Sequence, residues 1–305
     1  MFYEKKNRQK PKKRQVIMMK VLSFGEVLWD IFGDKKTLGG APLNFSAHLS
    51  RLGADVTFVS AVGDDALGKE TLAAVEATGL RTDAIAVLEG TRTGFCAVTL
   101  ENGTPHYDLA RGVAYDRIPY PALPETRPDA LYLGTLASRE APSHATASRL
   151  LAESGAKEVF FDVNIRGNDW SEALIAEYLA HTTLLKLSRE ELYAFSSFGK
   201  DGETVCKAVC KAFPNMTQVI LTLDKDGAMV YDAGAGAFLR SPVPKNKPVS
   251  TVGAGDSFSA CYLYNYLAGE PTALCLARAV ALSDFVVTQL GAVPDYPDTL
   301  WEKIR

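Results

Sequence analysis

The sequence predicts an α/β fold in which a mostly parallel sheet is covered by helices on both faces. Short runs of β-branched and apolar residues alternate along the chain with longer amphipathic stretches, the pattern of strand-helix-strand units. With 305 residues, of which 47% are hydrophobic and 23% are charged, the chain can bury a large core. The expected strands are residues 21–24, 56–62, 130–133, 159–163, 184–187 and 219–223, and the expected helices are residues 43–52, 67–78, 143–154, 172–181, 190–195 and 203–213.

The first twenty residues differ in composition from the rest. They hold eight lysines and arginines against one glutamate, a net charge of +7, so the remainder carries −3 − 7 = −10. We expect residues 1–19 to be a solvated, disordered tail, because no aromatic residues interleave the charges as in a nucleic-acid-binding stripe. Met18 and Met19 precede the first strand, so an upstream start or a cloning extension is an alternative explanation. The fold should begin near Lys20.

The cysteines and the hydropathy exclude several classes of protein. The five cysteines follow neither metal-ligand spacing nor a secreted disulfide framework, so we expect a reducing, cytoplasmic environment. No apolar run approaches the roughly 20 residues of a membrane span, and no apolar signal segment follows the basic start. We therefore expect no membrane partner. The cysteines are Cys96, Cys206, Cys210, Cys261 and Cys275.

Gly39 and Gly40 directly precede the first expected helix. Pro42 suits the first turn of that helix, and Gly53 suits its end. The glycine pair therefore opens a helix, with the Asn44 amide facing its mouth. Bare backbone N–H groups and an amide side chain suit a ligand rich in hydroxyl groups. The alternative is a tight turn that only leads into a helix.

Residues 93–111 break the strand-helix alternation. Residues 93–100 alternate in polarity, Asn102-Gly103 is a type I′ turn signal, and residues 106–110 return as a second strand. Together with residues 29–37 this hairpin predicts a small second sheet over the helix mouths. The alternative is an ordinary hairpin at a sheet edge.

Gly253, Ala254, Gly255 and Asp256 stand where a loop becomes a helix. The free N–H groups and the helix dipole of such a first turn attract an anion, and glycine lets a phosphate approach the backbone. A carboxylate in the same turn can take a proton from an attacking hydroxyl, so the segment fits phosphoryl transfer. The alternative is a flexible turn whose aspartate only caps the helix.

These two glycine motifs, in this order and at this separation, resemble the hallmarks of the ribokinase-like (PfkB) family of sugar kinases. The resemblance runs from about Met19 to Val293 and implies a ribokinase-like three-layer α/β/α fold with a small β lid, a kinase domain over residues 20–305, and a lid at about residues 29–37 and 93–111. Intermediate stretches match as well, namely Gly25, Glu26 and Asp30; Val62, Gly63, Asp64, Asp65 and Gly68; and Asp162, Asn164, Arg166 and Trp170, a segment seen especially in fructokinases.

The resemblance implies a sugar site and a catalytic base. It puts Asp30, Gly39, Gly40 and Asn44 around the sugar, and Asp256 against the hydroxyl that is phosphorylated. Gly253, Ala254 and Gly255 would stabilise the migrating charge. A buried Asp30 without a ligand would be costly, which favours a functional over a structural role for it.

The resemblance also implies a nucleotide site with ATP and Mg²⁺. Glu191 would assist the Mg²⁺ ion through water, unless it is a plain surface residue of a helix. Three positions depart from the family pattern: Ser188 stands in the place of asparagine, Asp224 follows Thr222 where relatives carry glycine, and residues 250–252 replace Asp-Thr-Thr. The last change weakens the case for a monovalent cation such as K⁺. The implied nucleotide residues are Asn164, Arg166, Lys186, Ser188, Thr222, Gly227, Gly253 and Gly255.

The activity implied is that of an ATP-dependent sugar kinase, with fructose as the expected acceptor. The fructose preference rests on the resemblance alone, and ribose, 2-keto-3-deoxygluconate and adenosine remain alternatives. A non-catalytic sugar-binding regulatory protein on the same fold is another alternative, and a nucleic-acid role of the basic tail is a third. The family also implies a homodimer formed through the lid, with the sugar and ATP as small-molecule ligands and no nucleic-acid partner.

Overall fold

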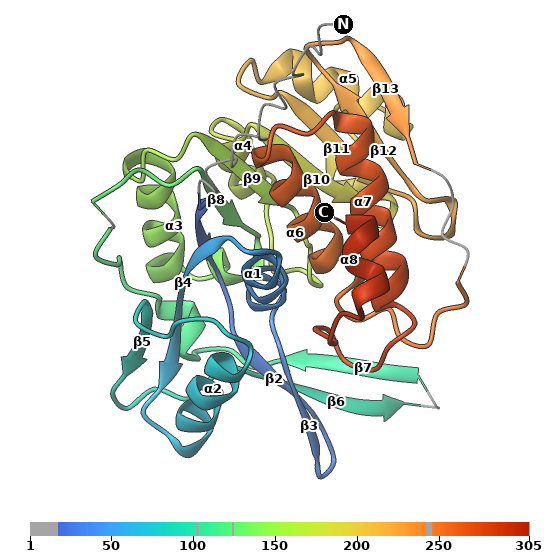
Figure 1. Ribbon diagram of the computed structural model, residues 1–305. Coiled ribbons are helices and arrows are strands. Elements are labelled where there is room, and N and C mark those ends of the chain that lie inside the picture. Colours follow the sequence, from blue (N-terminus) through green and yellow to red (C-terminus); the bar gives the residue numbers. More distant parts are fainter. Residues whose placement is uncertain (1–17, 102–103, 124, 242–245, 305) are drawn as a thin grey trace, which may run out of the picture.

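A central sheet of nine strands crosses the computed structural model in the order β13-β12-β11-β10-β9-β8-β1-β4-β5 (Figure 1). The structure describes residues 18–101, 104–123, 125–241 and 246–304. All neighbouring strands are parallel except for the antiparallel pairs β11-β12 and β12-β13. The strands are β1 (Lys20–Phe24), β4 (Asp55–Gly63), β5 (Ile85–Leu88), β8 (Ala130–Leu133), β9 (Glu158–Asp162), β10 (Leu184–Ser188), β11 (Gln218–Thr222), β12 (Ala228–Asp232) and β13 (Ala237–Arg240).

Helices cover both faces of this sheet, so the predicted three-layer fold is confirmed. Alternate residues along β1 show the two faces, because Leu22 packs in one apolar cluster with α3, α4 and α5, and Val21 packs in the other with α1, α6, α7 and α8. The α-helices are α1 (Ala41–Leu52), α2 (Ala66–Ala77), α3 (Ala141–Glu153), α4 (Glu172–Leu179), α5 (Gly202–Ala212), α6 (Ala254–Leu267), α7 (Thr272–Val286) and α8 (Asp298–Ile304), and the 3₁₀ helices are η1 (Ala114–Arg117), η2 (Leu136–Ser138), η3 (Arg189–Phe195) and η4 (Asp224–Asp226).

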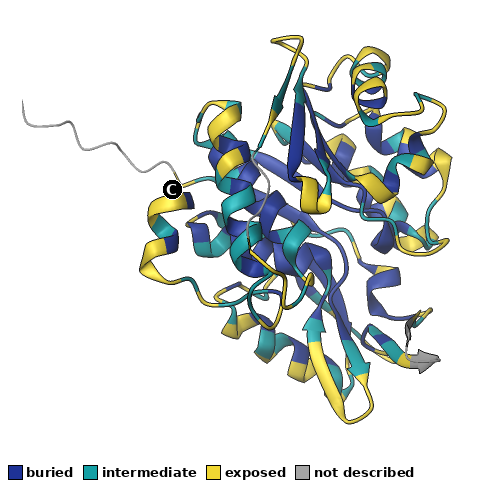
Figure 2. Cartoon of the chain, turned by 90° about the vertical axis from the view of Figure 1, so that its right-hand side faces the viewer, coloured by how far each residue is buried: buried dark blue, intermediate teal, exposed yellow. Residues whose placement is uncertain are grey.

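A smaller sheet of four strands, in the order β3-β2-β6-β7, projects from one end of the molecule (Figure 1). It is the second sheet that the sequence predicts, although the Asn102-Gly103 turn lies outside the described residues. Figure 2 shows that the central strands are buried, whereas the projecting hairpin carries exposed residues. The strands of the small sheet are β2 (Leu28–Phe32), β3 (Lys35–Gly39), β6 (Phe95–Glu101) and β7 (Thr104–Leu109).

The structure differs from the sequence-based prediction in a few elements. The expected helix at residues 190–195 is instead the 3₁₀ helix η3, which spans Arg189–Phe195. The strands β5, β12 and β13 and the helices α7 and α8 were not predicted. Residues 1–17 of the expected tail lie outside the described residues. Among the described helices, none combines the length and the apolar character that crossing a membrane requires.

The two helices that the glycine motifs open begin as the sequence predicts. Pro42 lies in the first turn of α1, and Gly53 ends α1 in the left-handed conformation, with φ 110°. Gly253 is the N-cap of α6, with φ 79°. The helices α1 and α6 pack against each other, and this contact brings the two motifs together.

Candidate active site

The starts of α1 and α6 meet at the edge of the sheet where the parallel strands have their carboxyl ends. There the Asn44 amide Nδ2 donates a hydrogen bond of 2.8 Å to the Asp256 carboxylate Oδ2, across 212 positions of sequence. Ligands bind at this edge in open α/β sheets. The contact therefore joins the two motifs that the sequence singles out into one site.

The glycines that precede both helices are required by the backbone. Gly40 has φ 115°, and a Cβ atom there would lie 2.5 Å from the Glu26 carbonyl oxygen. Gly253 has φ 79°, and its Cβ atom would lie 2.5 Å from the Ala292 carbonyl oxygen. No other residue fits either position without strain, so the backbone path into each helix depends on glycine. The first-turn N–H groups of α6 then form a site for an anion.

Asp256 carries a carboxyl group whose pKa is raised. It lies in the first turn of α6, where desolvation by the surrounding protein raises the pKa of its carboxyl to about 6. The hydrogen bond from Asn44 opposes this rise, and the nearby Asp162 carboxylate adds to it. A carboxyl with a pKa near the working pH accepts a proton from a hydroxyl more effectively than an ordinary aspartate does.

A buried ion pair lies beneath the first turn of α6. The Lys186 ammonium Nζ is 2.9 Å from Asp162 Oδ1, and both side chains are almost fully buried. The Ser259 hydroxyl donates to the other Asp162 oxygen at 2.9 Å. A Cβ atom on Gly255 would lie only 3.3 Å from Nζ, so the ammonium faces the anion-binding turn. The pair thus fixes a positive charge at the place where phosphoryl charge would develop.

Two further carboxyl groups, those of Asp30 and Glu26, lie beside the glycine pair at the start of α1. Asp30, in β2, is half-buried, and burial raises the pKa of its carboxyl. Its Oδ2 atom would lie 3.0 Å from a Cβ atom on Gly39, so the glycine makes room for the carboxylate. Burial also raises the pKa of Glu26 to about 7. We did not predict Glu26 as a site residue, although its place two residues after β1 was a usable signal.

Asn164 and Arg166 follow β9 at the same edge of the sheet. Asn164 adopts φ 45°, a left-handed conformation that turns the chain sharply after the strand. Arg166 is exposed, and its guanidinium opposes the burial-driven rise in pKa at all three site carboxyls, Glu26, Asp30 and Asp256. The positive charge of Arg166 therefore faces the site.

A cavity of about 130 Å³ adjoins the start of α6. It collects three of the residues expected to bind the nucleotide, Thr222, Gly227 and Gly255. A larger cavity of about 360 Å³ opens at the amino ends of β1 and β4, far from the anion-binding turn, and it contains none of the motif residues. The smaller cavity is thus the better place for a nucleotide. Its lining residues are Thr222, Asp224, Gly227, Ala228, Ala254, Gly255, Phe258, Val280 and Ser283.

Asp224 occupies this cavity in an unusual conformation. Its φ of 51° lies in the left-handed region, so the loop keeps the backbone path for which glycine is the usual residue. The pKa of the Asp224 carboxyl is raised, mainly by a hydrogen bond with Glu190 and to a smaller extent by burial.

Glu191 does not lie on the surface, so the alternative of a plain surface residue is wrong. Its side chain is buried, with Oε1 accepting the Ile165 N–H at 2.8 Å and Oε2 accepting the Ser188 N–H at 2.7 Å. With both oxygens held by the backbone, this carboxylate suits contact with a hydrated ion better than direct coordination. Among the described residues, no group of three or more histidine, cysteine, aspartate or glutamate side chains is placed to hold a metal ion.

The fold and the site together define a phosphotransferase, because an anion-binding helix start, a buried ammonium and a poised carboxylate converge on one point. The family model of the "pfkB family carbohydrate kinase" matches residues 13–299. The chain therefore belongs to the PfkB family of carbohydrate kinases, enzymes that phosphorylate a sugar hydroxyl.

Individual relatives are distant but match along nearly the whole chain. The chain is 29% identical to an ATP-dependent 6-phosphofructokinase of Thermoanaerobacterium thermosaccharolyticum, over 91% of each protein. It is 27% identical to a probable fructokinase-4 of Arabidopsis thaliana, over 91% of this chain and 93% of that protein. Among solved structures, a fructokinase from Vibrio cholerae with bound fructose, ADP and calcium superposes with a TM-score of 0.82 at 22% identity, over 94% of this chain and 99% of that one.

Proposed function

We propose that this chain transfers the γ-phosphoryl group of ATP to a hydroxyl of fructose. The observation that supports the proposal is the Asn44–Asp256 hydrogen bond, in which an amide lies beside a carboxylate at the start of α6. Fructose is favoured as the acceptor because curated relatives that match over 91% of this chain include fructokinases. The carboxyl groups of Glu26 and Asp30 would accept hydrogen bonds from sugar hydroxyls.

In the proposed reaction, Asp256 takes the proton of the acceptor hydroxyl as its oxygen forms a bond to the γ-phosphorus. The bond between that phosphorus and the β-γ bridging oxygen breaks, and ADP leaves with the electron pair. The backbone N–H groups of Gly253, Ala254 and Gly255 stabilise the charge on the transferring group. The buried Lys186 ammonium would add positive charge beneath the first turn of α6. The exposed Arg166 guanidinium would neutralise phosphate charge from the solvent side of the site.

The nucleotide would lie in the cavity beside α6, against Thr222 and Gly227. Asn164, Arg166 and Ser188 would approach its phosphates from the ends of β9 and β10. Mg²⁺ would arrive with ATP and neutralise the phosphate charge, with Glu191 touching its hydration shell through water. Any activation by K⁺ should be at most severalfold, because residues 250–252 lack a carboxylate. Replacing KCl with choline chloride in the assay tests this expectation.

We further propose that the protein forms a homodimer through the small sheet and works in the cytoplasm. Phe32 and Tyr107 lie on this sheet and are 46% and 62% exposed, so both offer apolar surface to a second chain. The free cysteines suit a reducing compartment. Light scattering should give about twice the chain mass of 33.0 kDa. A mass of one chain would contradict the dimer.

The test of the activity is ADP release from Mg-ATP with a panel of acceptors. We expect the highest kcat/KM with fructose, against ribose, glucose, tagatose, 2-keto-3-deoxygluconate and adenosine. Selectivity for another acceptor would retain the mechanism and reject fructose. A regulatory, non-catalytic role is the second candidate, because Asp224 adds an acid to the cavity expected to hold phosphates. Sugar binding by calorimetry without ADP release from any acceptor would favour that role.

A further inference from the structure

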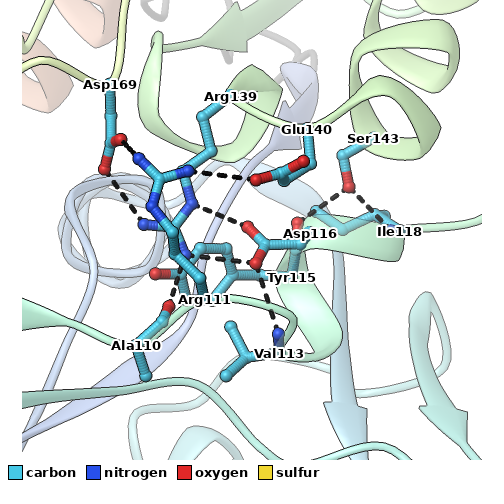
Figure 3. Close-up of polar contacts among 10 residues, drawn as sticks. All are labelled: Ala110, Arg111, Val113, Tyr115, Asp116, Ile118, Arg139, Glu140, Ser143 and Asp169. Carbon is cyan, nitrogen blue, oxygen red and sulfur yellow. Dashed lines mark hydrogen bonds and ion pairs between the residues drawn. The ribbon is translucent and has the colours of Figure 1, made fainter.

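A buried arginine, Arg139, lies outside the catalytic centre and contacts both Ala110, at the end of the small sheet, and Asp169, in the loop after β9 (Figure 3). The Arg139 side chain is 1% exposed and follows η2. Its Nε donates to Asp116 Oδ1 at 2.8 Å, and its Nη1 donates to Asp169 Oδ2 at 3.0 Å. Its Nη2 donates to Asp116 Oδ2 at 3.1 Å and to the Ala110 carbonyl. The guanidinium also lies 4.9 Å from the Tyr115 ring centroid.

One arm of this network reaches the point where the chain leaves the small sheet. Ala110 directly follows β7, and Gly112 has φ 66°, a turn that redirects the chain. Asp116, which Arg139 holds through two oxygens, also accepts the Val113 N–H at 3.2 Å. Ala110 and Asp116 lie before and after this turn, so Arg139 binds the chain on both sides of the point where it leaves the small sheet.

The other arm reaches the loop after β9. The Asp169 N–H donates to the Arg166 carbonyl at 3.0 Å, so Asp169 closes the turn that begins at Arg166. One Asp169 oxygen binds Arg139, and the other binds Arg111, which is itself part of the small-sheet exit. The Arg139 and Asp169 side chains are 1% and 10% exposed, so the charge-assisted bond between them is shielded from solvent, whereas Arg111 is 58% exposed.

We infer that Arg139 is a positioning residue which, through Asp169, couples the small sheet to the Arg166 turn, so that sugar and nucleotide bind cooperatively. A sugar bound beneath the small sheet would fix the contacts of Arg139 with Ala110, Asp116 and Asp169 in one arrangement. That arrangement would orient the Arg166 guanidinium toward the phosphates of the nucleotide. The nucleotide would favour the same arrangement by contacting Arg166. The two affinities are then linked reciprocally. This inference rests on the proposed function.

The experiment measures the dissociation constant of a non-hydrolysable ATP analogue with and without saturating fructose. In the wild-type protein we expect fructose to tighten analogue binding at least about fivefold, the lower end of usual couplings. Asp169→Ala removes the link to the Arg166 turn but leaves the buried Arg139–Asp116 pair intact. We expect it to bring the ratio close to one, while the affinity for fructose alone changes less than about threefold.

Two further variants separate positioning from general damage. Asp169→Asn keeps an oxygen for Arg139 and should restore part of the fructose effect. Glu140→Ala removes only the exposed partner of Arg111, at 3.0 Å, and should leave the ratio at the wild-type value. Equal ratios in wild type, Asp169→Ala and Glu140→Ala would overturn the inference.

The remaining outcomes distinguish a failed coupling from a failed function. A wild-type protein that binds both ligands with a ratio of one retains the kinase proposal and overturns the coupling. A wild-type protein that binds neither ligand contradicts the proposed function, and the coupling falls with it. An equal loss of fructose affinity and analogue affinity in Asp169→Ala would indicate general disruption of the site, which also overturns the inference.

Discussion

Replacing Glu26 by glutamine should stabilise the protein at alkaline pH. Glu26 is 3% exposed, and burial is the largest cause of the rise in its pKa from 4.5 to about 7. Above pH 7 the folded protein therefore carries a buried carboxylate that the unfolded chain would expose to water. Glutamine stays neutral and keeps an oxygen that can accept the Ala41 N–H, so the substitution removes the charge with little change in shape.

The size of this effect follows from the two pKa values. Each pKa unit corresponds to about 1.4 kcal/mol, so the rise from 4.5 to about 7 costs the ionised protein about 3 kcal/mol of unfolding free energy. The sign is that of a raised carboxyl pKa: the folded state binds the proton more tightly, so stability is present at acid pH and is lost as pH rises from about 4.5 to 7. Below about pH 4.5 both states are protonated, and the variant should then match the wild type.

Urea denaturation at pH 4.5, 6 and 8 measures this difference directly. We expect Glu26→Gln to exceed the wild type by about 3 kcal/mol at pH 8 and by less than about 1 kcal/mol at pH 4.5. Glu89→Gln, at an exposed position, is the matched control and should change stability by less than about 0.5 kcal/mol throughout. A Glu26→Gln protein that is no more stable than wild type at pH 8 would refute the reasoning.

Three other expectations concern the base and the buried pair. Asp256 must be ionised to accept a proton, and its pKa is raised to about 6, so kcat/KM should fall about tenfold per pH unit below pH 6. A kcat/KM that stays constant down to pH 5 would exclude Asp256 as the base. Asn44→Leu removes the hydrogen bond that lowers this pKa, so the acid limb of the same profile should move to higher pH, and an unmoved limb would contradict the contact. Lys186→Met leaves the Asp162 carboxylate buried without its partner and should lower the free energy of unfolding, measured by urea denaturation, by about 3–5 kcal/mol. The control Lys157→Met, at an exposed ion pair, should lower it by less than about 1 kcal/mol. Similar losses of unfolding free energy in the two variants would contradict the role of burial.

Sequence reasoning located the features that local chemistry determines. The starts of α1 and α6 follow from glycine, proline and apolar spacing within a dozen residues, and these signals are independent of the rest of the chain. The order of the two motifs then indicated a shared site. The Asn44–Asp256 hydrogen bond itself depends on the packing of α1 against α6, which no local pattern contains.

The features that sequence reasoning missed are set by neighbours in space. Lys186 pairs with Asp162 because β9 and β10 lie side by side, and the strand pattern does not state which strands are neighbours. Glu191 reads as a helix residue, yet its carboxylate binds the backbone of the loop after β9. Arg139 follows the short helix η2 with no motif around it, and only the fold brings Asp116 and Asp169 to it.

The most direct test of the central claim compares Asp256→Asn with wild type in two assays on the same preparations. Calorimetry measures fructose binding, and ADP release measures phosphoryl transfer. Asparagine keeps the shape of the side chain but cannot take the proton, so we predict fructose affinity within about tenfold of wild type and turnover reduced at least about 10³-fold. Asp34→Asn, on the exposed turn of the small sheet, is the matched control and should leave both unchanged. Turnover by Asp256→Asn within tenfold of wild type would contradict the account.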